Sequence, residues 1–102
     1  MSYSVVTINS NIDMDVNSYT GYNYFLVDCS SNNVTIQLTS SVWDGYTFIF
    51  QRVDTNSSNT LTLSAKTGTT INGSSSVTCG VKTYNQIVNY SSDWKCPSIS
   101  YN

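Results

Sequence analysis

Residues 32–64, NNVTIQLTSSVWDGYTFIFQRVDTNSSNTLTLS, decide the fold class of this chain. Three runs alternate apolar with polar residues, and Asn, Asp, Gly and Ser separate one run from the next. Val34, Ile36 and Leu38 fall on one face of an extended strand, because side chains in a strand repeat every two residues. The stretch therefore predicts β-strands joined by turns.

The rest of the chain continues this pattern. Strands are expected at residues 5–8, 22–27, 34–38, 46–50, 61–63, 77–81, 84–90 and 94–101, with a weaker alternation of Ile12, Met14 and Val16. Tyr46, Tyr84 and Trp94 are expected to pack inward. No helical repeat is sustained over three turns. The chain is therefore predicted to be all-β, a single small antiparallel β-sandwich or jelly-roll-like domain. Residues 1–21 would supply N-terminal strands joining a stalk, and residues 22–102 the core sheet.

Charge and length exclude several classes of partner. The chain has 102 residues, four Lys and Arg, and a formal net charge of −2. Nucleic-acid binding needs clustered cations to neutralise phosphates, so no nucleic-acid partner is expected. No apolar run approaches the roughly 20 residues of a membrane span, so no membrane insertion is expected.

The residues needed for catalysis are also missing. The sequence has no His and no Glu, so a Ser or Cys nucleophile has no histidine base. Asp13 and Asp15 have the DxD spacing of some metal sites, but they lie in an alternating run and are read as solvated, outward-facing carboxylates. We therefore expect no enzyme, with no catalytic residue, no cofactor and no metal.

The three cysteines leave two readings open. Cys79 and Cys96 could lie on neighbouring strands and pair, which would leave Cys29 as a free thiol. Alternatively, all three are reduced and serve as small packing residues.

The apolar content is low for a chain of this size. Leu, Ile, Val and Phe supply 24 of 102 residues, whereas Ser, Thr and Asn supply 18, 13 and 12. A small domain with few aliphatic residues buries little surface to offset the cost of ordering its backbone. This mismatch predicts an oligomer whose subunits share apolar faces. The interface candidates are Tyr22, Tyr24, Phe25, Phe48, Phe50 and Arg52.

The order of motifs carries a resemblance. VDCSSNNVTIQLTSS is followed by DGYTFIFQRVDTNSSNTLTLSA, then by TTINGSSSVT and finally by SSDWK. This order resembles a β-domain at the head or C-terminal tip of bacteriophage tail fibres and of fibre-like or collagen-like proteins of large DNA viruses. Thr39 stands where that family has Pro, and the Gly usual before Trp94 is missing. The matching positions are Val27-Asp28, Val34 to Leu38, Gly45, Phe48, Arg52, Asp54, Ile71, Gly73 and Trp94.

The resemblance implies a viral structural protein. It would be a trimeric fibre head or trimerisation domain on the virion surface that contacts a host-surface glycan or protein receptor. The alternative is a non-catalytic carbohydrate-binding β-sandwich module, in which some of the eight Tyr and two Trp would stack on sugars. The homotrimer is the assembly that we expect, with its apolar faces meeting at a threefold axis.

Arg52 and Asp54 allow two readings. Two residues apart, they share one face of a strand and could form a solvated ion pair worth well under 1 kcal/mol. In the sharper hypothesis, Arg52 lies near the subunit interface and fixes register through a carboxylate or a backbone carbonyl.

Overall fold

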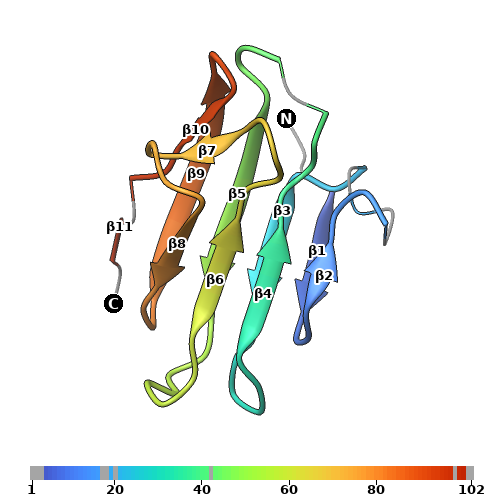
Figure 1. Cartoon of the computed structure of the whole chain (residues 1–102). Coiled ribbons are helices and arrows are strands. Elements are labelled where there is room, and N and C mark those ends of the chain that lie inside the picture. The colour runs from blue at the N-terminus through green and yellow to red at the C-terminus, as the bar shows by residue number, and fades with distance from the viewer. Residues whose placement is uncertain (1–3, 17–18, 20, 42, 98, 101–102) are drawn as a thin grey trace.

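The regular structure is entirely β. The computed structural model describes residues 4–16, 19, 21–41, 43–97 and 99–100, so the part of the predicted last strand at Tyr101 lies outside the described residues. No helix in this part of the chain could cross a lipid bilayer. The strands, seen in Figure 1, are β1 (Val5–Ile8), β2 (Ile12–Asp13), β3 (Tyr24–Val27), β4 (Val34–Gln37), β5 (Thr47–Arg52), β6 (Leu61–Ser64), β7 (Thr70–Ile71), β8 (Ser76–Cys79), β9 (Thr83–Tyr90), β10 (Asp93–Lys95) and β11 (Ile99–Ser100).

The first six strands form three stacked coils of two strands each. The chain passes from β1 to β2, from β3 to β4 and from β5 to β6, and each coil adds one strand to each of two sheets. We call the sheet with β1, β3 and β5 sheet A, and the sheet with β2, β4 and β6 sheet B; both sets run parallel. Figure 1 shows sheet B in front of sheet A.

The all-β prediction is confirmed, but the antiparallel sandwich or jelly roll is wrong. Alternation specifies which side chains share a face, yet it does not specify which strand pairs with which. Here each coil repeats the path of the one before, as in a solenoid, so Phe25 lies beside Phe50 and Ile36 beside Leu63.

Antiparallel strands close the C-terminal side of the coils. β8 pairs with β6 in sheet B, and β9 pairs with β5 in sheet A, so the chain crosses from one sheet to the other between β8 and β9. The far edge of β9 pairs with β10 and β11, and β7 runs parallel to β10. We call this group, β7 to β11, the cap.

The core lies between the two sheets. Phe25 stacks on Phe50 with ring centroids 4.7 Å apart, and Phe48 packs against Phe25 and Trp94. Trp94 is fully buried and Tyr46 is packed against the core, as predicted. Tyr84 is not, because the inward positions of β9 are Thr83, Asn85, Ile87 and Asn89.

Asparagine side chains bind one turn to the next. Stacked turns cannot form a full backbone ladder, so amide side chains supply the missing partners. The carboxamide oxygens of Asn11 and Asn33 accept from the backbone N–H groups of Thr35 and Thr60. In the opposite direction, the amide groups of Asn32, Asn56 and Asn59 donate to the carbonyls of Asn9, Ser30 and Cys29.

Truncation of a central aromatic side chain tests this core. Phe25→Ala should destabilise the protein by about 3–5 kcal/mol, because it removes a fully buried ring and leaves a cavity against Phe48 and Phe50. Val53→Ala, at an exposed position just after β5, should change the free energy of unfolding by about 0.5 kcal/mol or less. Urea unfolding followed by circular dichroism measures both, and equal losses would contradict the described core.

Candidate functional site

Arg52 lies inside the protein, where the third coil meets the cap. It stands next to Val27, which in turn stands next to Ile8, in the same inward-facing row of sheet A, and the residue is only 1% exposed. Nε and Nη2 donate to the two oxygens of Asp54 at 2.9 and 3.1 Å. Nη1 donates to the carbonyl of Cys79 at 3.0 Å, and Nη2 also reaches the carbonyls of Asn56 and Asn59.

Asp54 completes this cluster. Its carboxylate accepts from the backbone N–H groups of Cys29 and Asn56 as well as from Arg52. Burial by itself would raise the pKa of Asp54, but these hydrogen bonds outweigh burial and lower the pKa to about 2. The pair therefore stays ionised and joins the turn of the second coil, the turn of the third coil and the end of β8.

The solvated-pair reading of Arg52 and Asp54 is wrong, because both side chains are buried, whereas the placement of Arg52 near a subunit interface stays a prediction. The side chain is buried, and its hydrogen bonds described above stay within its own chain. Residues 54–59 and Cys79 close around it, so the register that it fixes is that of the coils and the cap.

A second charged cluster joins the turn after β2 to the turn after β6. Lys66 Nζ donates to Asp13 at 2.6 Å and to Asp15 at 3.0 Å. The hydrogen bond from Lys66 lowers the pKa of Asp13, and that from Thr39 is the main cause of the lowered pKa of Asp15. The DxD carboxylates therefore share a protein cation instead of facing solvent freely.

The three cysteines are buried as thiols and form no disulfide with one another. Asn85 donates to Cys79 Sγ and accepts from Cys96 Sγ, each at 3.3 Å, so an amide lies between the two thiols. Burial raises the pKa of Cys79 to about 12 and also raises the pKa of Cys29. All three therefore act as packing residues, and the alternative of a Cys79–Cys96 disulfide does not hold.

The predicted interface residues divide between the inside and the outside of one chain. Phe25, Phe48 and Phe50 are at most 1% exposed and pack between the sheets. The apolar surface that motivated the interface prediction at these positions is thus already covered within one chain. Tyr22 and Tyr24 are half-buried, and Tyr24 Oη donates to Gln51 on the outer face of sheet A.

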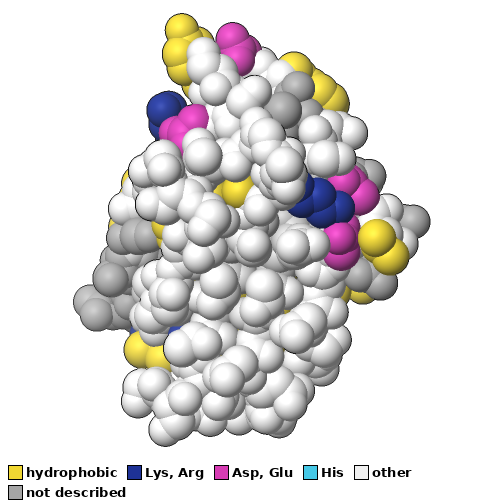
Figure 2. Space-filling model, in the orientation of Figure 1, with side chains coloured by type: hydrophobic (Ala, Val, Ile, Leu, Met, Phe, Trp, Pro, Cys, Tyr) yellow, Lys and Arg dark blue, Asp and Glu magenta, His cyan; other side chains and the backbone are white. Residues whose placement is uncertain are grey.

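The outer faces of the two sheets differ in chemistry. Sheet B presents rows of neutral polar side chains, Thr35 beside Thr62 beside Thr78. Figure 2 views this face and shows it almost free of charge and apolar groups, with charged side chains toward its margins. The outward positions of β1, β3, β5 and β9 also lack charge but are more apolar: Val5, Thr7, Tyr24, Leu26, Thr47, Ile49, Gln51, Tyr84, Gln86, Val88 and Tyr90. We call this surface face A.

The interface candidates expected from the sequence include tyrosines near face A but none of the aliphatic residues on that face. Leu26 and Ile49 alternate with Phe25, Phe48 and Phe50, and Ile49 is buried although it points away from the core cluster. The signal was present, because a run such as YFLV or TFIF is apolar on both faces.

Comparison with known proteins adds no assignment. No family model matches the chain, and no curated protein sequence matches it.

Loss of the Arg52 side chain should lower the free energy of unfolding far more than loss of an exposed ion pair would. Arg52→Ala leaves Asp54 and three carbonyls buried without their donor, so the free energy of unfolding should fall by about 3–5 kcal/mol. Lys95→Ala, which removes an exposed partner of Asp93, is the control and should cost well under 1 kcal/mol. Similar losses in the two variants, measured by urea unfolding, would refute the role given to Arg52.

Stability should also fall in acid. The folded-state pKa of Asp54, about 2, lies below the ordinary value, so its stabilisation is complete above about pH 4 and is lost as the pH falls through about 2. Asp54→Asn removes this contribution, and its stability should therefore vary less between pH 4 and pH 2 than that of the wild type. The measurement is the midpoint of urea unfolding at each pH, and parallel curves for the two proteins would contradict the prediction.

Proposed function

We propose that the chain is a structural protein of a virion surface fibre, a head or trimerisation domain that forms a homotrimer through face A. The observation that carries this proposal is the contrast between the two outer faces. Face A presents Leu26 and Val88 among tyrosines, with no charged residue on β1, β3, β5 or β9 pointing outward, whereas the outer face of sheet B presents hydroxyl and amide groups.

Burial of face A against other copies is the favourable use of such a surface. Apolar area removed from water contributes about 25 cal/mol per Å². The charges of neighbouring β10 on this side of sheet A, Asp93 and Lys95, lie beside Tyr90 and Val88 at its margin and already form an ion pair. A threefold arrangement closes on itself, so every copy is covered in the same way and no apolar face is left over. The other outer face would then remain toward solvent.

The residues that match the motifs of viral fibre heads have structural roles in this fold. Gly45 and Gly73 adopt positive φ in turns, Trp94 fills the core, and Arg52 binds Asp54. A motif set of this kind specifies a scaffold, and this supports a structural role more than a catalytic one.

The carbohydrate-binding alternative keeps one observation in its favour. Trp43 is 58% exposed while the second tryptophan, Trp94, is fully buried. A glycan contact is compatible with a fibre head, since attachment to a host surface also needs a ligand.

A charge placed on face A should separate the subunits. We expect wild-type protein at micromolar concentration to sediment at three times the mass of one chain. Leu26→Asp puts a carboxylate at a half-buried position of face A and should shift the equilibrium toward monomer, because the charge would be desolvated in the interface. Sedimentation equilibrium measures the mass.

Thr62→Asp is the matched control. Thr62 is half-buried on an inner strand of sheet B and faces outward, so the same new charge should leave the trimer intact. Circular dichroism establishes that both variants remain folded. A folded wild-type monomer, or equal dissociation of both variants, would refute the proposed assembly.

A further inference from the structure

One tryptophan is held rigidly at the surface. The ring of Trp43 stacks on that of Tyr46 with centroids 3.9 Å apart and an angle of 7° between the planes. Tyr46 in turn packs against Phe48 and Trp94 in the core. The Trp43 ring therefore rests on a support that is continuous with the core, although 58% of the residue is exposed.

The backbone fixes this aromatic pair as well. The N–H of Tyr46 donates to the carbonyl of Trp43, which closes a turn through Gly45 at φ 89°. The N–H of Gly45 donates to the carbonyl of Asn89, and the N–H of Asn89 donates to the carbonyl of Tyr46. The turn is thus bound to β9 on both sides and presents the ring in one orientation.

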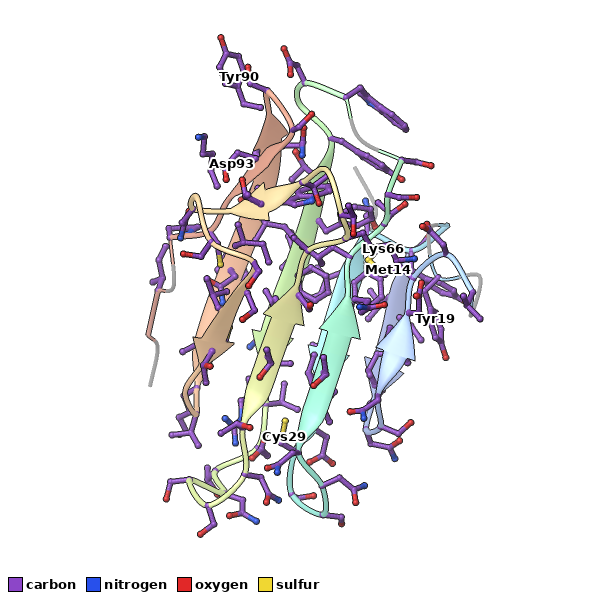
Figure 3. The ribbon with its side chains drawn as sticks, in the orientation of Figure 1. Met14, Tyr19, Cys29, Lys66, Tyr90 and Asp93 are labelled. Carbon is purple, nitrogen blue, oxygen red and sulfur yellow. The ribbon has the colours of Figure 1, made fainter. Side chains whose placement is uncertain are left out.

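A second exposed ring and a carboxylate lie at the same end of the molecule. Asp44 accepts a hydrogen bond from the N–H of Ser91, which follows Tyr90 in the turn between β9 and β10. Tyr90 is 60% exposed and projects beyond the end of β9 (Figure 3). Figure 2 shows hydrophobic side chains on either side of an acidic one at this end. We call Trp43, Asp44 and Tyr90 the aromatic tip.

We propose that the aromatic tip binds a neutral pyranose of a glycan, with the sugar ring lying on Trp43 and Asp44 accepting from its hydroxyls. An exposed ring that is already immobilised loses little entropy on binding, which favours contact with a ligand. The described residues form no pocket, so the ligand meets an open platform and offers a flat face of its own. A pyranose with equatorial hydroxyls has such a face, made of C–H groups, with hydrogen-bond donors around its edge.

Charge at the tip selects among sugars. Asp44 is exposed beside Trp43, and Asp93 lies just beyond the turn that Asp44 holds. Lys95 already forms an ion pair with Asp93 at 2.7 Å. A sialylated or sulfated glycan would bring a like charge to Asp44, so the neutral sugar is the favoured ligand.

This inference names the receptor class of the proposed fibre head and rests on that function for its biological meaning. The binding itself does not depend on the trimer. Sedimentation reports on assembly and a sugar titration reports on the tip, so failure of one is distinguishable from failure of the other.

Sugar binding is followed through the NMR signals of the two indole N–H groups, one in Trp43 and one in Trp94. In a ¹⁵N-correlated NMR spectrum, the signal that disappears in Trp43→Phe belongs to Trp43, and that of Trp94 is an internal control. The probes are N,N′,N″-triacetylchitotriose, cellotriose, lactose and 3′-sialyllactose at millimolar concentrations. We expect at least one neutral probe to shift the Trp43 signal in a saturable way, the Trp94 signal to move little, and 3′-sialyllactose to bind more weakly than lactose.

Substitutions then locate the site. Trp43→Ala should weaken binding on the order of tenfold or more, as followed by saturation-transfer difference signals of the sugar, and Trp43→Phe should keep part of the affinity. Val53→Ala removes exposed apolar surface just after the C-terminal end of β5, whereas the tip precedes β5, and should leave binding unchanged. Absence of saturable binding by every neutral probe, or binding that survives Trp43→Ala, would overturn the proposal. A change of assembly in Trp43→Ala without any sugar binding would assign the ring to a subunit contact instead.

Discussion

The buried pair of Arg52 and Asp54 is the interaction on which the rest of the fold depends. A solenoid of aliphatic rungs has no feature that determines which coil is last. Arg52 supplies one, because its guanidinium replaces an aliphatic rung after Ile8 and Val27 and needs several acceptors. The turn after β5 and the end of β8 provide them, so the ion pair specifies where coiling stops and the cap begins.

The composition follows from the same architecture. Parallel coils place their turns one above another, and each turn exposes backbone groups that need partners. Asn32, Asn56 and Asn59 meet this need by donating to carbonyls of earlier turns. Many of the asparagines are therefore explained by hydrogen bonds between successive turns.

Most strand positions could be predicted from the sequence, but their partners could not. Alternation places Val34 and Ile36 on one face whether the neighbouring strand is parallel or antiparallel. A count of aliphatic residues understates the core, because Met14, three cysteines, Arg52 and buried asparagines also occupy inward positions. The oligomer expected from that count stays a prediction. Trp43 was beyond prediction for a different reason, since its contact with Tyr46 depends on how one turn is bound to β9.

The cap touches the coils in a restricted way, and this bears on how such a chain can vary in length. β8 pairs only with β6, and β9 pairs with β5 alone among the coil strands. A coil duplicated ahead of β5 would meet the same kind of neighbour on each side, and the pairing of β8 and β9 with the last coil would be unaffected. The number of coils and the composition of the cap are therefore separable traits in this architecture, open to independent change by duplication of whole coils or by substitution within the cap.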